Sequence, residues 1–423
     1  MRQRRFIAAS AALAVLGSGL MLGACSSPGN ESASAEGPVD ITYWLWQDDA
    51  TDPTWENLVK EFNASQNKVK VTMETIPLDQ YQNQLVTSVI NGTGPDAARS
   101  KDWWLGQFAP EGAIADLTTY VDAWEGKNDV VESLWDSGRL PGKDNVFMLP
   151  HQYTTLYLYY RTDVFAEHGL QPPKSQDEFL EVAQKLADAG QYAMDVRGGA
   201  GGQDQWLAWM YAGGARVVND AGEVVLDDAT AVEVNQKYLD IVTKYNAAPP
   251  GSITAAFADV KTNFADGLTA MMIHHPGSLT EMQEHFGDKL GVVPIPTVDG
   301  ANGATLGSMS GNVIMSTSKK KDAAWKWISW LDEHDPMATM SESPQGQLPV
   351  LQSVIDLPEY TDNAKLKVAV DAIHTAITWP GLAGVSELAA KAWNPTIQSA
   401  FQNEKTSMEA LTEMADILRK GIK

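Results

Sequence analysis

Cysteine is almost absent from this sequence of 423 residues, which contains a single one, Cys25. One cysteine excludes an intrachain disulfide framework, a zinc site built on cysteines and a Cys-X-X-Cys redox centre. The seven histidines are scattered and show no recognised ligand spacing. We therefore expect no metal and no cofactor, and the position of the lone cysteine becomes informative.

Basic side chains are also scarce. The chain has 31 Lys and Arg against 54 Asp and Glu, a formal net charge of -23, and no dense basic run. Binding to nucleic acid needs clustered Lys and Arg that displace counterions from the phosphates. The composition thus argues against a nucleic acid or another polyanion as a partner, and it predicts a neutral or cationic ligand.

The amino terminus has the three parts of an export signal. Three arginines precede an apolar and small-residue stretch from Phe6 to Leu22, and small residues then lead to Cys25. This order predicts a secretory signal peptide at residues 1–24. Its end resembles a bacterial lipobox, which implies cleavage before Cys25 and acylation there. A transmembrane anchor is disfavoured, because a span needs about 20 strongly apolar residues. The composition of residues 25–38 predicts a flexible tether. We therefore expect an extracytoplasmic protein that is held at the outer face of the cell membrane.

From Val39 onward, apolar residues recur with periods of two and of 3.6, which is typical of an α/β protein. Such a long chain exceeds one ordinary domain, so we expect two lobes. Alternation predicts strands at 41–45 and 69–74, and helical spacing predicts helices at 55–62, 81–89, 231–245, 322–331, 366–377 and 408–422.

Local signals mark the ends of several elements. Gly92, followed by Pro95, predicts a helix that ends in a left-handed glycine. Two capping boxes, each a Ser or Thr with Glu three residues later, predict helix starts at Ser175 with Glu178 and at Thr406 with Glu409. Four tryptophans fit core positions of the predicted elements: Trp44, Trp55, Trp325 and Trp327.

Four sequence blocks, in order along nearly the whole chain, resemble one protein family. They are Asn91–Asp96 with Ala115–Leu117, then Phe147–Pro150 with Leu158–Asp163, then Phe264–Met271 with Pro294–Pro296, and last Lys319–Ile328 with Leu348 and Pro349. Any one block is a weak signal, but four in register are specific. The chain resembles the extracellular solute-binding proteins (family 1) of bacterial ABC importers, of the maltose- and oligosaccharide-binding type.

The resemblance implies the two-lobe periplasmic-binding-protein fold of type II, an α/β Venus-flytrap whose cleft closes on the ligand. It implies two lobes of two segments each, namely residues 39–149 with 273–333 and residues 150–272 with 334–423. The implied crossings lie near Leu149–Gln152, near Met271–His274 and after Leu331. It also implies a monomer that captures a neutral oligosaccharide and delivers it to the permease subunits of an ABC importer.

The implied cleft loops are both aromatic and polar. Ligands of α/β proteins lie at the carboxyl ends of strands and between domains. A sugar offers C–H faces to an aromatic ring and hydroxyls to carboxylates and amides. The candidate ligand-binding residues are Trp46, Asp48, Asp102, Trp103, Trp104, Tyr153, Thr154, Gln203, Trp206, His274, Gly307, Ser308 and Trp379. For Trp46, Trp103 and Trp206, packing in the core is an equal alternative.

One block departs from the family pattern. After Met271, many members have a Gly-Pro-Trp whose Trp stacks on sugar, whereas this sequence reads His274-His275-Pro276-Gly277. Either a histidine replaces the platform, or the ligand differs from the maltose type. Metal binding by the two histidines is disfavoured, because neighbouring side chains of an extended segment point to opposite faces.

A secreted glycoside hydrolase is the alternative function. It would need two carboxylates across a scissile bond, and Asp48, Asp49, Asp102 and Asp204 are available in the implied cleft. The sequence has no motif for a Ser or Cys nucleophile, no HExxH zinc site and no phosphate loop. We therefore expect a binding protein and not an enzyme.

Overall fold

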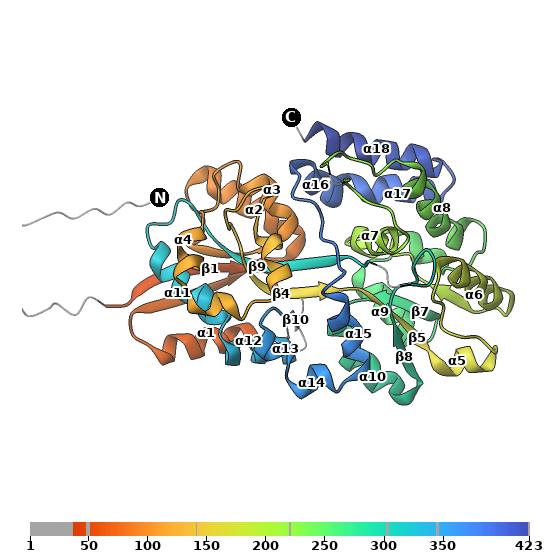
Figure 1. The fold of residues 1–423 in the computed structure, drawn as a ribbon, viewed down its shortest axis with the longest axis horizontal. Helices are drawn as coiled ribbons and strands as arrows, with labels where there is room; N and C mark the ends of the chain where they lie inside the picture. Colours follow the sequence, from red (N-terminus) through yellow and green to blue (C-terminus); the bar gives the residue numbers. More distant parts are fainter. Residues whose placement is uncertain are drawn as a thin grey trace, which may run out of the picture. The chain divides into compact units, whose positions relative to one another are not determined.

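The computed structural model describes residues 37–47, 51–140, 142–219, 221–301, 304–343 and 347–421. The predicted signal peptide, Cys25 and Asp48 lie outside the described residues. From Pro38 on, the chain forms one unit, and this unit contains two separate sheets (Figure 1).

The first sheet has six strands in the order β10-β4-β9-β3-β1-β2. The strands are β1 (Val39–Leu45), β2 (Val69–Thr75), β3 (Ala97–Lys101), β4 (Leu149–Thr155), β9 (Gly307–Ile314) and β10 (Leu348–Pro349). β1 is parallel to both β2 and β3, whereas β9 runs antiparallel between β3 and β4. On β1 the alternating residues Ile41, Tyr43 and Leu45 are buried, which confirms the predicted apolar face.

Helices before, between and after these strands complete the first half of the unit. They are α1 (Thr54–Ser65), α2 (Leu78–Asn91), α3 (Leu105–Phe108), α4 (Thr118–Ala123), α11 (Lys321–Leu331), α12 (His334–Glu342), α13 (Gln352–Ile355) and α14 (Pro358–Thr361). α2 ends at Gly92 with φ of 66°, the left-handed end that the sequence predicts. Trp55 of α1 and Trp327 of α11 are fully buried, as predicted. Trp44 and Trp325 pack against the core as well but are only half-buried.

The second sheet has four strands in the order β6-β7-β5-β8. They are β5 (Tyr157–Arg161), β6 (Tyr192–Met194), β7 (Thr269–His274) and β8 (Leu290–Val293). β7 is buried along its whole length, since it pairs with β6 on one side and with β5 on the other. The helices of this half are α5 (Thr162–Glu167), α6 (Gln176–Asp188), α7 (Gly202–Ala212), α8 (Ala229–Thr243), α9 (Phe257–Ala265), α10 (Leu279–Phe286), α15 (Ala364–Ala372), α16 (Ala383–Glu387), α17 (Trp393–Phe401) and α18 (Ser407–Lys420).

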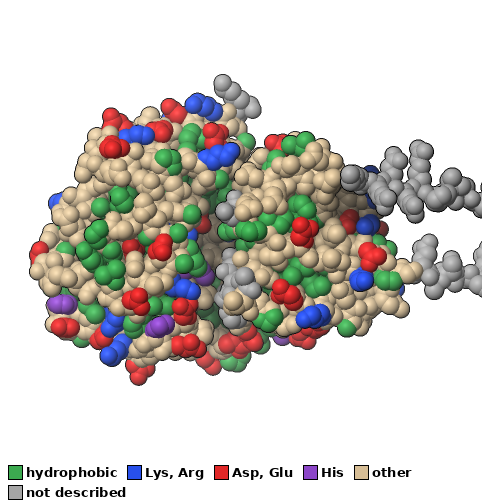
Figure 2. Space-filling model, turned by 180° about the vertical axis from the view of Figure 1, so that it is seen from behind, with side chains coloured by type: hydrophobic (Ala, Val, Ile, Leu, Met, Phe, Trp, Pro, Cys, Tyr) green, Lys and Arg blue, Asp and Glu red, His purple; other side chains and the backbone are tan. Residues whose placement is uncertain are grey.

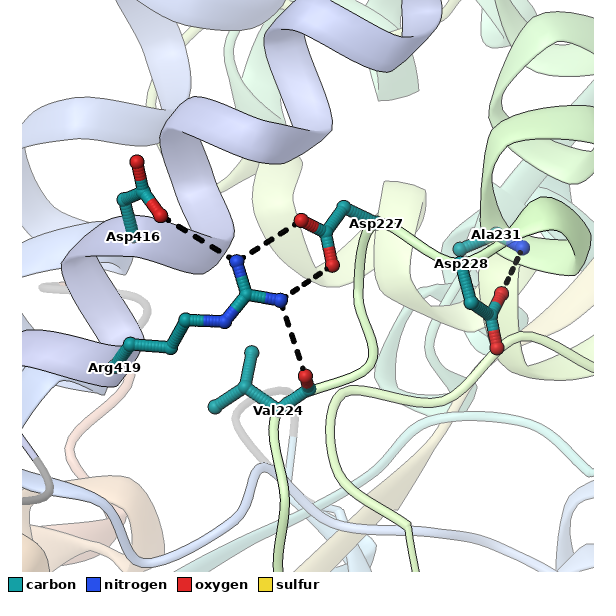
Figure 3. A network of polar contacts seen from close by, with 6 residues as sticks. All are labelled: Val224, Asp227, Asp228, Ala231, Asp416 and Arg419. Atoms are coloured by element: carbon teal, nitrogen blue, oxygen red, sulfur yellow. Dashed lines mark hydrogen bonds and ion pairs between the residues drawn. The ribbon is translucent and has the colours of Figure 1, made fainter.

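Both predicted capping boxes are present. Ser175 accepts a hydrogen bond from the backbone of Glu178 at the start of α6, and Thr406 accepts one from Glu409 at the start of α18. Arg419, near the end of α18, donates to both carboxylate oxygens of Asp227, at 2.9 and 2.6 Å, and to the backbone of Val224 (Figure 3). The next residue, Asp228, caps α8. The carboxy-terminal helix is thus held against the start of α8 by a bidentate ion pair.

Several segments lie in a different half from the one that the resemblance implies, among them residues 150–155 of β4, helix α10 and helices α12, α13 and α14. Leu290–Val293, expected in the first lobe, pairs as β8 with β5 in the four-stranded sheet. Leu348 and Pro349, expected in the second lobe, pair as β10 with β4 in the six-stranded sheet, and α12 contacts α1 and α11. Strands of four and two residues carry almost no alternation, so only tertiary pairing decides where they lie. The other lobe boundaries stay a prediction.

No helix among the described residues is long and apolar enough to cross a membrane.

Candidate functional site

Elements of both halves meet at the loop of residues 377–382. Its backbone accepts hydrogen bonds from Gly307 at the start of β9 (N to Ile377 O, 3.0 Å) and from Tyr211 of α7 (Oη to Thr378 O, 3.1 Å). Gly106 of α3 lies so close that a Cβ there would stand 2.7 Å from the carbonyl oxygen of Gly381. When the unit is viewed from behind relative to Figure 1, a furrow divides its surface into two parts (Figure 2). The two halves therefore approach each other around this loop.

Asp102 is the buried carboxylate on the side of the six-stranded sheet. It begins η1 (Asp102–Trp104), a 3-10 turn at the carboxyl end of β3. One oxygen, Oδ1, accepts the backbone N–H of Trp103 at 3.0 Å, while Oδ2 is buried and has no hydrogen-bond partner within the described part of the chain. Burial raises the pKa of Asp102 to about 7, the backbone amide of Met309 and the charge of Lys101 oppose this, and Asp204 adds to it. A buried acceptor without a partner is a position that a ligand donor can fill.

Tyr153 and Gly307 form the neighbouring wall. Tyr153 of β4 is buried, and the charge of Asp102 contributes to raising the pKa of its phenol above the usual range, after burial itself. A Cβ at Gly307 would stand 2.0 Å from the Tyr153 hydroxyl and 3.0 Å from Cβ of Ala376. Only glycine therefore fits at residue 307. Ser308 follows it on β9, half-buried, and Thr154 donates from its hydroxyl to the side chain of Gln347, away from Asp102.

Helix α7 supplies the other side. It follows a glycine-rich turn in which Gly201 has φ of 76° and a Cβ at Gly202 would stand 1.7 Å from the carbonyl oxygen of Arg197. This turn places Gln203 and Asp204 in the first turn of α7, where the helix dipole favours a carboxylate. Gln203 is buried, and its Oε1 has no partner in the part of the chain that the structure covers.

Trp379 joins the loop to α7. Its indole Nε1 donates to Oδ1 of Asp204 at 3.2 Å, and its side chain is buried. Tyr211 lies two turns further along α7, and the charge of Asp102 reaches it as well. Of the predicted residues, Gly307 lies against Tyr153 and bonds to the loop that carries Trp379, and Trp379 bonds to Asp204, which the sequence offered only as a carboxylate for hydrolysis. Tyr211, which the sequence did not suggest, bonds to the same loop.

The charged groups near these residues are two carboxylates and two cations. The charge of Lys101 lowers the pKa of Asp102, and the charge of Asp204 raises the pKa of Arg197. Burial lowers the pKa of Arg197 to about 10, while Asp204 opposes the shift. Two carboxylates and two cations can offer both acceptors and donors, which is the mixture that a hydroxyl-rich neutral molecule requires.

Three of the predicted tryptophans have internal partners instead. Trp206 is fully buried, packs against Trp393 at 6.0 Å and donates from its indole to Asn235 of α8 at 2.8 Å. It faces the interior because α7 is buried nearly all round, so a glycine-rich turn before a helix does not tell which residue meets the ligand. We place Trp206 in the core.

Trp46 and Trp104 are likewise packed inside the first half. Trp46 lies under the guanidinium of Arg99, 4.1 Å from the ring centroid, and meets Tyr81 and Trp104 edge to face. Trp104 stacks on Tyr81 at 5.7 Å. Trp103, the remaining tryptophan of η1, is 7% exposed. Since the rings of Trp46 and Trp104 are covered by protein, neither offers a face to a sugar in this conformation.

His274 is also an internal residue. It is 2% exposed and is packed against Phe257 at 4.3 Å and His275 at 4.7 Å, with Ser278 2.7 Å from its Nδ1. Burial, and then the neighbouring His275, hold the pKa of His274 well below its ordinary value, so its ring is neutral. Within the described residues no group of three or more His, Cys, Asp or Glu is arranged to hold a metal ion.

Comparison with known proteins places this geometry in context. The family described as bacterial extracellular solute-binding protein matches residues 48–337. A Brucella abortus protein named as a binding protein is 27% identical over 344 residues, which cover 80% of this chain and 82% of that protein. The maltotriose-binding protein of Pyrococcus abyssi is 22% identical over 77% of this chain and 70% of its own length.

A solved structure shares the fold. The solute-binding protein of an ABC transporter from Thermotoga lettingae, bound with α-D-tagatose, superposes with a TM-score of 0.80 at 24% identity, covering 91% of this chain and all of that one. The predicted two-lobe α/β fold of periplasmic sugar-binding proteins is confirmed by this likeness.

Proposed function

Because the chain belongs to the bacterial extracellular solute-binding protein family, we propose that it is the substrate-binding protein of an ABC sugar importer. In this proposal it captures a neutral oligosaccharide between η1 and α7 and delivers it to the permease. The observation that carries the proposal is the loop of residues 377–382, which Trp379 joins to Asp204 of α7 and which accepts a hydrogen bond from Gly307 of the six-stranded sheet.

The chemistry of these groups favours a neutral, hydroxyl-rich ligand. Hydroxyls can donate to the carboxylates of Asp102 and Asp204 and accept from Lys101 and Arg197. An anionic ligand would add a negative charge next to the buried carboxyl of Asp102 and the half-buried carboxylate of Asp204, which favours a neutral ligand. The names of two similar proteins, one binding maltotriose and one bound with tagatose, support a sugar.

Contact with both halves predicts a conformational response. A ligand that touches η1 and α7 at the same time binds the closed arrangement better than the open one. Scattering at saturating ligand should therefore show a smaller radius of gyration than scattering without ligand, and an unchanged radius would count against the proposal.

A thermal-shift screen against mono- and oligosaccharides tests the ligand class. A sugar that binds only the folded protein raises the melting temperature, by an amount that grows with its concentration. We expect a neutral sugar to give the largest shift. A sugar phosphate that stabilises the protein more than its parent sugar would overturn the proposal, and so would a panel without any stabilising sugar.

The same protein can be tested against the alternative of a glycoside hydrolase. Carboxylates such as Asp102 and Asp204 could in principle serve hydrolysis, but a receptor returns its ligand unchanged. Chromatography of an oligosaccharide after long incubation with the protein should therefore show no product. Release of shorter sugars in molar excess over the protein would favour the enzyme.

We also propose that the mature protein is acylated at Cys25 and stays at the outer face of the cell membrane, on the strength of the amino-terminal sequence alone. Cys25→Ala should abolish acylation and release the protein from the membrane fraction. A variant that is processed at the same site and stays fully membrane-bound would contradict this.

A further inference from the structure

A hollow at the surface of the first half lies outside the site described above. It has a volume of about 770 Å³, is open to solvent, and is bordered by α4, by η2 (Glu125–Asn128), and by the junction of α11 with α12. Three aromatic side chains line it, Tyr120 and Trp124 from the α4 region and Trp325 from α11.

The three rings form a corner. Trp124 meets Trp325 at 6.1 Å with an angle of 87° between the ring planes, and Tyr120 stacks on Trp325 at 5.3 Å. The Tyr120 hydroxyl donates to Asp322 at 2.6 Å, which fixes its ring. Trp124 lies on the backbone of Gly126, where a Cβ would stand 2.4 Å from the indole. The corner is therefore held in place by its own contacts.

These rings pack against the core of the first half but are only partly buried by it. Helix α11 buries Ala323, Ala324, Trp327, Ile328 and Leu331, whereas Trp325 lies on another face and is half-buried, as are Tyr120 and Trp124. Three large aromatic side chains kept at a surface hollow are unusual, because such side chains mostly serve cores and binding sites.

The wall of the hollow is acidic. Four of its twelve residues are Asp or Glu and none is Lys or Arg. Acidic residues are therefore more frequent in this wall than in the whole chain, where they are 54 of 423. Asp332 is paired with His151 at 2.6 Å and Asp129 accepts from Ser353, which leaves Glu125 and Glu333 as the exposed carboxylates of the wall. The nearby Lys127 donates to the backbone of Asp122 at 2.6 Å.

Rings and carboxylates together select one ligand chemistry. A cation is attracted by the negative face of an indole and by carboxylates, and alkylated ammonium groups are favoured by aromatic corners because they are weakly hydrated. An anion is repelled, and a neutral sugar can stack on the rings and donate to the carboxylates but gains no net charge attraction. We propose that the hollow lined by Tyr120, Trp124 and Trp325 binds a small organic cation that carries an alkylated ammonium group.

Choline is a suitable probe, and 3,3-dimethyl-1-butanol is its neutral isostere. Titration is followed by the indole N–H signals of ¹⁵N-labelled protein, with those of Trp124 and Trp325 assigned from Trp124→Phe and Trp325→Phe. We expect saturable shifts of these two signals with choline and about tenfold weaker binding of the alcohol at equal ionic strength.

Substitutions test the corner and the charge separately. Trp124→Ala and Gly126→Ala should each weaken choline binding about tenfold or more, and Glu333→Gln should weaken it severalfold. Trp330→Phe is the matched control, because Trp330 lies on the same helix but packs against Phe62 and Trp327. It should leave choline binding unchanged.

A lipid headgroup carries the same ammonium chemistry as a free solute. Sedimentation with phosphatidylcholine vesicles that depends on Trp124 would assign the ammonium to a lipid, and choline binding without sedimentation would assign it to a free solute. Equal affinity for choline and its neutral isostere would overturn the proposal, as would choline shifts that survive Trp124→Ala. Absence of any shift at Trp124 and Trp325 would overturn it too.

Discussion

Trp379 and Asp204 are joined by a hydrogen bond of 3.2 Å from the indole Nε1 to Oδ1, which ties the loop of residues 377–382 to helix α7. Trp379→Phe keeps an aromatic face but loses this donor, so we expect affinity for the sugar to fall by about 1 kcal/mol. Trp379→Ala removes this donor and the buried ring that holds the loop against α7, so affinity should fall at least as far. Calorimetric titration measures both, with Trp330→Phe as a control, and affinities within twofold of the original protein would remove Trp379 from the site.

Asp102 should make sugar binding depend on pH. Its pKa of about 7 is raised by burial above the unfolded value near 3.8, so the carboxyl is neutral below pH 7 in the free protein. Because the folded protein holds the Asp102 proton more tightly than the unfolded chain, the contribution of Asp102 to the free energy of unfolding is lost as the pH rises from about 4 through 7. Sugar binding that needs the ionised carboxylate depends on pH in the opposite sense. The affinity should increase as the pH rises to 7 and should fall by up to about tenfold for each pH unit below 7.

Asp102→Asn provides the control for this prediction. The amide cannot ionise, so affinity should be lower above pH 7 and nearly flat between pH 5 and 8. Charged neighbours, namely Asp204, Lys101 and Arg197, are unchanged in the variant. Identical pH profiles for both proteins would show that Asp102 does not govern binding.

Trp206 should behave as a core residue. It is fully buried against Trp393 and bonded to Asn235, so Trp206→Ala should lower the free energy of unfolding by about 3–5 kcal/mol. Affinity for the sugar, measured at a temperature where the variant is folded, should change less than threefold. Loss of affinity for the sugar with an unchanged free energy of unfolding would show that Trp206 contacts the ligand and is not a core residue.

His151 and Asp332 form a buried pair, 2.6 Å apart, between β4 and the end of α11. Burial raises the pKa of Asp332 to about 6, and His151 opposes this. Removing the imidazole leaves a buried carboxylate without its partner, so His151→Leu should cost about 3–5 kcal/mol of stability at pH 7.5.

The cost should shrink on acidification. Because the folded pKa of Asp332 lies above its unfolded value, protonation below about pH 6 favours the folded state. Denaturant unfolding of His151→Leu and the original protein at pH 7.5 and 5 measures the difference, and a cost that grows at pH 5 would contradict the assignment of the charge to Asp332.

Periodicity and capping signals were enough to predict much of the fold. Ile41, Tyr43 and Leu45 alternate because β1 has one face on the core, and the Ser175 and Thr406 capping boxes depend only on residues three apart. The lobe boundaries implied by the resemblance did not show where β8 and β10 pair, because the partners of so short a strand lie far away in sequence.

The site was harder to predict than the fold. Asp102 was named because the resemblance puts the loop after Pro95 at the cleft, whereas Tyr211 sits within α7 among residues that look like core. Trp46 and Trp206 could not be told from ligand platforms by composition, since a buried indole and a stacking indole are the same residue in a different contact. Only the three-dimensional packing separates them.

A crystal structure with the sugar that gives the largest thermal shift tests the central proposal most directly. We predict electron density for the sugar between η1 and α7, with ring hydroxyls within hydrogen-bond distance of Asp102 and Asp204. Density for the sugar elsewhere, with neither carboxylate in contact, would contradict the proposed site.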